Sequence, residues 1–206
     1  MAEQEEECGC PACQVSILFP TSELPADRTP VIVGIDVSTK NVAIGIIPAL
    51  GELDDVATFG IPISAKHDPT RCIEAAERVY PILAQVHQSV DITSVAIEMP
   101  AGFGGKIIPM VGAITASVGG RNCEWYAPST WQKILRSELG IQHKGQGIKQ
   151  VIHDALSEYL PESHRYWDQI NEDAKDSIAI AIAHRTETMR KVSEISDYDM
   201  EWLRGQ

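Results

Sequence analysis

The chain has 206 residues, of which 44% are hydrophobic, so it is long and apolar enough for one domain with a sizeable core and is not an unstructured polypeptide. Its net charge of −12 has the wrong sign for binding nucleic acid through overall charge, so such a function would need a local basic patch and cations that offset acidic groups. The sequence has no run of about 18 apolar residues, no secretory signal and no transit peptide. We therefore expect a cytoplasmic protein without membrane contact.

The N-terminal segment, residues 1–30, is acidic and contains several prolines, and we interpret it as a tail. Cys8, Cys10 and Cys13 form a C-x-C-x-x-C pattern that can place three thiolates around a structural zinc ion, which would still need a fourth ligand. The alternative is a reduced tail without metal. We expect one domain over residues 31–190 and a second tail over 191–206.

Residues 31–47 contain two β-branched runs separated by a polar turn at 38–41. They predict a β-hairpin at the centre of a sheet, with both faces of its first strand buried. Asp36 lies where that strand ends. An ionised carboxylate there costs several kcal/mol to desolvate unless a metal ion or a turn amide compensates it.

The elements that follow alternate between strand and helix patterns. We predict strands at 56–63, 92–97 and 123–127, the second of which ends at Glu98. A helix opens at Asp68 with a kink or break at Pro81, and a helix of small residues covers 107–118. The apolar face expected for the first of these helices consists of Ile73, Ala76, Tyr80, Leu83 and Val86 or His87.

Three further helices complete the chain. They cover 128–140, 149–159 and 172 to about 189, and Asn171 is the expected N-cap of the last. A Gly-rich basic loop lies at 142–147. The order β-β-β-α-β-α-β-α-α-α predicts an α/β fold in which a mixed five-stranded sheet is flanked by helices on both faces.

Carboxylates stand at comparable places in three separate elements. Asp36 and Glu98 end strands, and Asp173 and Asp176 share one face in the first turns of the final helix. Each has an ordinary explanation: a turn cap, a loop residue, or an acidic residue that stabilises a helix N-terminus. Together they indicate a cluster that holds two divalent ions for phosphodiester hydrolysis.

The motifs GIDVSTKNVAIGII, AIEMP and DAKDSIAIAIAHR resemble those of the RuvC family of Holliday junction resolvases, and YAPSTWQKIL and LGIQHKGQGIKQVI resemble the family's intervening segments. The resemblance covers about residues 31–187 and implies an RNase H-like fold. It also implies Mg²⁺ or Mn²⁺, two per active site, held by Asp36, Glu98, Asp173 and Asp176. The Cys-rich tail and the acidic charge depart from the family pattern. These departures suggest that the protein acts in the cytoplasm of a bacterial cell or of a phage-infected host cell.

The resemblance implies four-way DNA junctions as substrate, cut by paired symmetric nicks from a homodimer, with the helix at 107–118 as the interface. Phe103 would stack on bases, or else pack in the core. Candidate phosphate contacts, which could equally be a solvated surface, are Lys106, Lys133, Arg136, His143, Lys144 and Lys149.

Several other functions share some of these sequence features. A broader branched-DNA or flap nuclease and an RNA–DNA hybrid nuclease would use the same carboxylates. A non-enzymatic junction-binding scaffold would not need them. An actin or sugar-kinase domain also opens with a strand, an Asp and a Ser/Thr turn, but it needs a second phosphate loop, which this sequence lacks.

Overall fold

The computed structural model describes residues 28–53, 55–100, 105, 107–118, 122–160 and 167–204. The candidate zinc ligands Cys8, Cys10 and Cys13, and the candidate DNA contacts Phe103 and Lys106, lie outside these ranges.

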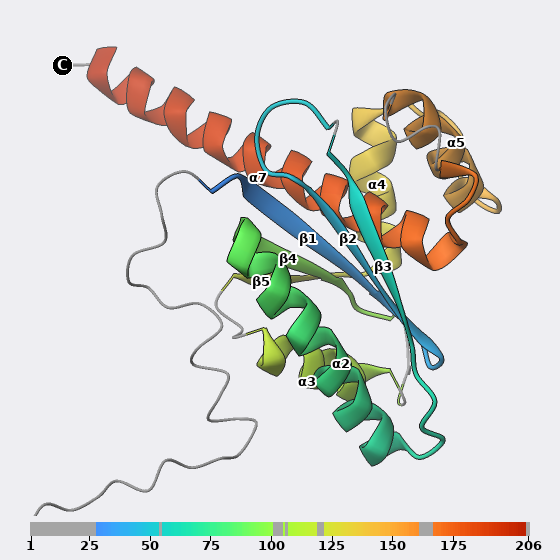
Figure 1. Cartoon of the computed structure of the whole chain (residues 1–206). Coiled ribbons are helices and arrows are strands. Elements are labelled where there is room, and N and C mark those ends of the chain that lie inside the picture. Colours follow the sequence, from blue (N-terminus) through green and yellow to red (C-terminus); the bar gives the residue numbers. More distant parts are fainter. Residues whose placement is uncertain are drawn as a thin grey trace, which may run out of the picture.

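A five-stranded mixed sheet forms the centre of the molecule in the strand order β3-β2-β1-β4-β5 (Figure 1). β1 pairs antiparallel with β2, which pairs antiparallel with β3, while β1–β4 and β4–β5 are parallel. This confirms the predicted α/β fold and the predicted number of strands. The strands are β1 (Pro30–Val37), β2 (Asn41–Pro48), β3 (Ala57–Pro62), β4 (Asp91–Glu98) and β5 (Cys123–Tyr126).

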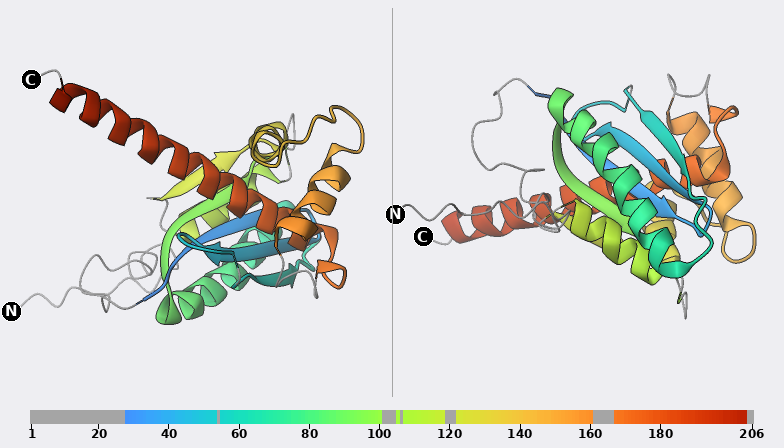
Figure 2. Two further views of the ribbon diagram at one scale, coloured as in Figure 1. Left: turned by 90° about the horizontal axis from the view of Figure 1, so that it is seen from above. Right: turned by 60° about the horizontal axis from the view of Figure 1, so that its bottom comes forward.

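Helices cover both faces of the sheet, as predicted (Figures 1 and 2). On one face, α2 (Asp68–Ser89) and α3 (Ile108–Ser117) pack on the odd-numbered residues of β1. On the other, α4 (Pro128–Glu138), α5 (Ile148–Tyr159) and α7 (Glu172–Arg204) enclose a second core that includes Ile32. Because side chains alternate along a strand, Asp36 shares the α7 face with Ile32 and Gly34.

Two glycines bring α7 unusually close to the sheet. Gly34 of β1 and Gly45 of β2 lie opposite each other in the ladder. A Cβ atom on Gly45 would lie 2.7 Å from the amide nitrogen of Ile178, and one on Gly34 would meet the backbone at Ser177. The absence of side chains here allows the helix backbone to rest on the strands, which fixes the start of α7 above the end of β1.

The helix α7 begins where expected and ends later than expected. Asn171 caps it, because the Asn171 side-chain oxygen accepts a hydrogen bond from the amide of Ala174 at 2.9 Å. The predicted end near residue 189 is wrong: α7 has 33 residues and continues to Arg204, beyond the sheet and through the segment expected to be a tail (Figure 2). Arg190 contributes to this extension by pairing with Glu187 and Glu194 on successive turns.

The helix α2 buries only part of the predicted face: Leu83 and His87 are buried as expected, but the face is otherwise made of other residues. Ile73 is 56% exposed, whereas Arg71 is buried, with its guanidinium bonded to the carbonyls of Ala65 and Lys66 and to Asp68. The buried positions recur at every fourth residue: Arg71, Ala75, Val79, Leu83 and His87. Of the kink or break expected at Pro81, the break is wrong, since the helix continues through this residue, which lies on its solvent side.

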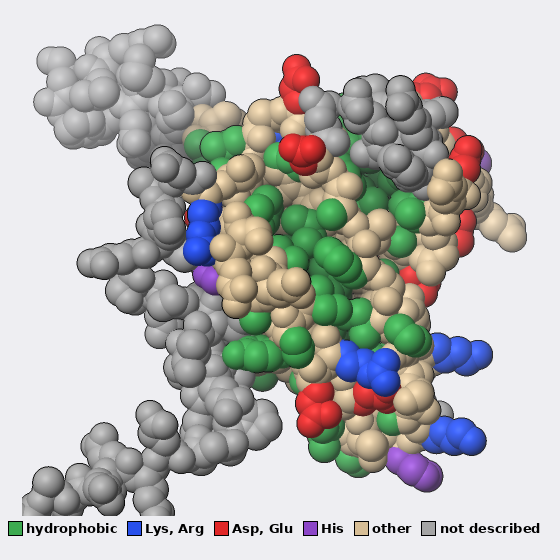
Figure 3. Space-filling view, viewed as in Figure 1, with side chains coloured by type: hydrophobic (Ala, Val, Ile, Leu, Met, Phe, Trp, Pro, Cys, Tyr) green, Lys and Arg blue, Asp and Glu red, His purple; other side chains and the backbone are tan. Residues whose placement is uncertain are grey.

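None of the described helices is both long and apolar enough to cross a membrane. The face of the molecule over β3 and α2 carries hydrophobic side chains along its middle and charged ones at its margins (Figure 3). Where side chains are described, this face has no continuous basic strip (Figure 3).

Candidate active site at the end of β1 and β4

Parallel pairing brings the first two candidate carboxylates to one edge of the sheet. Ile35 of β1 lies beside Ile97 of β4, so Asp36 and Glu98 follow at the same end of the two strands. Both alternate onto the α7 face, since Ala96, two residues before Glu98, belongs to the core beneath that helix. Asp36 is buried, with 8% of its surface exposed.

The first two turns of α7 add Asp173 and Asp176. The side-chain amide of Asn41, the first residue of β2, donates a hydrogen bond to Asp173 Oδ2 at 2.9 Å. Asp176 lies deeper and is 1% exposed. The close packing of Ser177 on Gly34 holds this turn over the strand that ends at Asp36.

The pKa of Asp36 is sensitive to the charges of the other three carboxylates. Burial, and after it the charges of Glu98, Asp176 and Asp173, together raise the pKa of Asp36 from 3.8 to about 8, while the charge of Lys149 opposes them. Burial also raises the pKa of Glu98, an effect that a hydrogen bond from Trp131 counters. Burial and mutual repulsion therefore both disfavour the ionised form of Asp36 in this cluster.

Neighbouring helices orient two of these carboxylates. Trp131 Nε1, from α4, donates a hydrogen bond to Glu98 Oε2 at 2.6 Å. His153 Nε2, from α5, lies 2.9 Å from Asp176 Oδ1. His153 is fully buried, and its Nδ1 lies 3.4 Å from a Glu172 carboxylate oxygen without hydrogen-bond geometry.

Sequence reasoning missed Asn41, Trp131 and His153. The sequence could have indicated His153, because it follows the candidate residue Lys149 by four positions and so lies on the same helix face. Trp131 and Asn41 have no such signal, since nothing local relates them to Glu98 or Asp173.

The candidate DNA contact Lys149 lies in the carboxylate cluster. Its ammonium pairs with Asp176 Oδ2, while its side chain is 45% exposed. Burial disfavours the ammonium, but the bond to Asp176 and the charges of Asp36 and Glu98 outweigh this and raise its pKa. The sequence analysis predicts Lys149 only as a phosphate contact and does not predict its position within the carboxylate cluster.

Three of the four carboxylates thus bond to protein groups. Within the described part of the chain, no three His, Cys, Asp or Glu side chains are close enough together to hold one metal ion as they stand. Oxygen donors from Asp and Glu nevertheless suit hard divalent cations.

The other candidate DNA contacts lie on α4 and on the connection between α4 and α5. Lys133 and Lys144 are exposed, as is His143, whose Nε2 lies 3.0 Å from the carbonyl oxygen of Gln146. Arg136 is partly buried. None of these four has a described contact with the carboxylate cluster.

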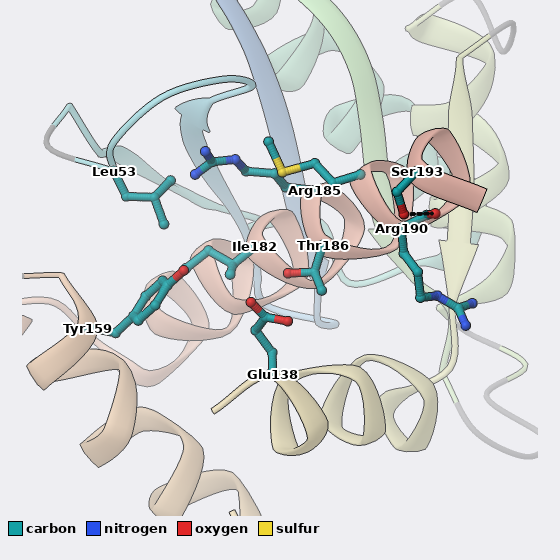
Figure 4. A pocket seen from close by; sticks show the side chains of 9 residues that line it. Leu53, Glu138, Tyr159, Ile182, Arg185, Thr186, Arg190 and Ser193 are labelled. Atoms are coloured by element: carbon teal, nitrogen blue, oxygen red, sulfur yellow. Dashed lines mark hydrogen bonds between the residues drawn. The ribbon is translucent and has the colours of Figure 1, made fainter. Parts of the chain in front are cut away.

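A separate pocket of about 370 Å³ lies farther along α7 (Figure 4). Ile182, Arg185 and Arg190 of α7 line it together with Glu138 and Tyr159. It includes none of the four carboxylates, so it is not the candidate active site.

No protein-family model matches the chain, and neither does any curated protein. A solved structure of T. thermophilus RuvC in complex with Holliday junction substrate is similar to it, with a TM-score of 0.58 and 17% identity, over 78% of this chain and 95% of that one. The fold is RNase H-like.

Two other solved structures resemble smaller parts of the chain. A ROK family transcriptional regulator has a TM-score of 0.42 at 11% identity and covers 53% of this chain and 31% of that one. For a ROK hexokinase from Thermus thermophilus the TM-score is 0.38 at 16% identity, with 57% and 39% covered. Scores this low do not establish a shared fold.

Proposed function

We propose that this protein is a metal-dependent endonuclease that cuts branched DNA, with four-way junctions as its preferred substrate and paired symmetric nicks as its product. The observation that carries the proposal is the convergence of Asp36, Glu98, Asp173 and Asp176 at the end of β1 and β4, in an RNase H-like fold.

The donor chemistry of the cluster fits Mg²⁺ or Mn²⁺. Four carboxylates provide oxygen ligands, and the raised pKa of Asp36 indicates that nearby positive charge would stabilise its ionised form. Bound ions would activate a water molecule and stabilise the leaving oxygen. Trp131 and His153 would hold Glu98 and Asp176 in place, as outer partners of metal ligands do.

Contacts with DNA would come from the face of the sheet that α4, α5 and α7 cover, which is also the face of the carboxylates. Lys133, Arg136, His143 and Lys144 belong to α4 and its connection to α5, and they would bind phosphates beside the cluster. Phe103 and Lys106 belong to the connection between β4 and α3; Phe103 is proposed to stack on bases at the junction centre, and Lys106 to bind phosphate. A homodimer that pairs two sites through α3 would account for two symmetric nicks.

A cleavage assay tests this proposal directly. Purified protein is incubated with a mobile four-way junction, a duplex, a flap and an RNA–DNA hybrid, each in Mg²⁺, Mn²⁺, Ca²⁺ or EDTA. We expect cleavage of the junction in Mg²⁺ and Mn²⁺ and binding without cleavage in Ca²⁺. The duplex should not be cleaved, and no substrate should be cleaved in EDTA. Cleavage in EDTA would refute the metal dependence, and preference for the flap or hybrid would change the substrate.

Two variants separate the site from the rest of the surface. Asp36→Asn should abolish cleavage and retain junction binding, because it removes a ligand and a negative charge. Asp55→Asn, at an exposed loop position away from the cluster, should behave as wild type. Cleavage by Asp36→Asn at the wild-type rate would disprove the assignment of this carboxylate.

A further inference from the structure

Both oxygens of the Asp176 carboxylate are engaged by α5. His153 holds Oδ1 at 2.9 Å from inside the core, and the Lys149 ammonium holds Oδ2 from the solvent side. Each oxygen of the Asp176 carboxylate therefore already has a partner, and the partner of Oδ2 is a positive charge with which a bound cation would compete.

The two partners differ in their freedom to leave. His153 is fully buried on the core side of α5, so it cannot move without disturbing the core. Lys149 lies in the first turn of α5 with its side chain 45% exposed, on a flexible four-carbon stem. Its ammonium can exchange Asp176 for water while α5 stays in place.

We propose that Lys149 is an exchangeable counter-ion of the carboxylate cluster, which releases Asp176 Oδ2 when a divalent cation binds and then offers its ammonium to a DNA phosphate. The inference rests on the proposed function and adds a coupling to it. A lysine that only completes an ion pair would stay on Asp176 in both states.

This exchange makes metal and DNA binding support each other. Cation binding frees a positive charge at the site, and a phosphate that engages the freed ammonium keeps it from returning to Asp176. By thermodynamic linkage, the factor by which the cation tightens DNA binding equals the factor by which DNA tightens cation binding.

The test compares Lys149→Met with Lys144→Met, an exposed lysine in the preceding connection. Ca²⁺ affinity is measured by calorimetry without DNA, and affinity for a four-way junction is measured at one salt concentration in Ca²⁺ and in EDTA. We expect Lys149→Met to bind Ca²⁺ about fivefold more tightly than wild type and to lose most of the Ca²⁺ enhancement of DNA binding. Lys144→Met should keep wild-type Ca²⁺ affinity and lose DNA affinity equally in both conditions.

A measurement on the wild-type protein does not depend on how the variants fold. Acetylation of lysines by a mild amine reagent is followed by peptide mass spectrometry with and without Ca²⁺. Lys149 should react faster in Ca²⁺, while Lys144 should not change.

The outcomes separate the two proposals. Unchanged or weaker Ca²⁺ affinity in Lys149→Met, or unchanged reactivity of Lys149, would overturn the exchange while leaving the nuclease proposal intact. Wild-type protein that binds neither Ca²⁺ nor Mg²⁺ would instead contradict the nuclease proposal itself.

Discussion

The backbone of Gly34 lies directly against the carbonyl oxygen of Ser177, so that a Cβ atom on Gly34 would be 2.0 Å from that oxygen. No L-amino acid other than glycine fits there unless α7 moves. Since Ser177 follows Asp176, this contact, together with that of Gly45, helps to hold the carboxylates of the helix close to those of the strands.

We expect Gly34→Ala to lower the free energy of unfolding by about 1–3 kcal/mol or more, because the clash is with backbone rather than with a flexible side chain. Gly60→Ala is the matched control, since Gly60 also lies in a strand but has open space where its Cβ would be. Urea denaturation measures both. Equal effects of the two substitutions would show that close packing of α7 is unimportant.

The pKa of Asp36 gives stability a definite dependence on pH when no metal is added. The folded protein keeps this proton up to about pH 8, whereas the unfolded chain releases it near 3.8. Between these values the folded state binds more protons, so the free energy of unfolding should fall as pH rises, by up to about 1.4 kcal/mol per unit from this group. Urea titrations in EDTA at about pH 5 and about pH 8 test this.

Asp36→Asn should flatten this pH dependence, because the amide does not titrate, and should make the protein more stable than wild type near pH 8. Added Mg²⁺ should stabilise wild type more at the higher pH, where the carboxylate is ionised. A wild-type stability that rises from pH 5 to pH 8 would contradict the raised pKa.

His153 should orient Asp176 rather than only fill space. His153→Leu removes the hydrogen bond to Asp176 Oδ1, and we expect Mg²⁺ affinity to fall by about 10–100-fold. His153→Gln keeps an amide donor and should lose less. Calorimetric Mg²⁺ titration with parallel urea denaturation distinguishes orientation from stability, and equal Mg²⁺ affinity in the two variants would leave only a packing role.

Trp131→Phe tests the bond to Glu98. The aromatic ring remains while the indole N–H that lies 2.6 Å from Glu98 Oε2 is lost. We expect a stability loss of about 1 kcal/mol and a higher pKa for Glu98, since this hydrogen bond favours the ionised carboxylate. Infrared titration of the carboxylates measures the second effect, and an unchanged Glu98 titration would argue against it.

The sequence predicted the strands because their β-branched runs need burial on both faces, and it predicted the cap at Asn171 from local chemistry. It placed Ile73 on the buried face of α2 because apolarity alone selected this residue, whereas Arg71 is buried through carbonyl partners that only the folded chain provides. The predicted end of α7 near residue 189 was too early, since no Gly or Pro interrupts the sequence between that residue and Gly205 and the helix continues to Arg204.

The positions of the carboxylates could be expected, because ends of parallel strands share an edge. The groups that bond to them could not, since Trp131 and His153 reach Glu98 and Asp176 from elements distant in the sequence. Whether Lys149 faces a carboxylate or solvent depends on the docking of α5 against α7, which no local pattern encodes.

The hydrogen bond between Asn41 and Asp173 joins residues 132 positions apart. Such long-range contacts form late, because the loop-closure entropy must be overcome before any contact rewards it. The sheet can therefore assemble while its acidic edge still lacks the carboxylates of α7. A chain in which α7 is not docked would lack two of the four carboxylates at this edge, so the candidate site is complete only when α7 rests on Gly34 and Gly45.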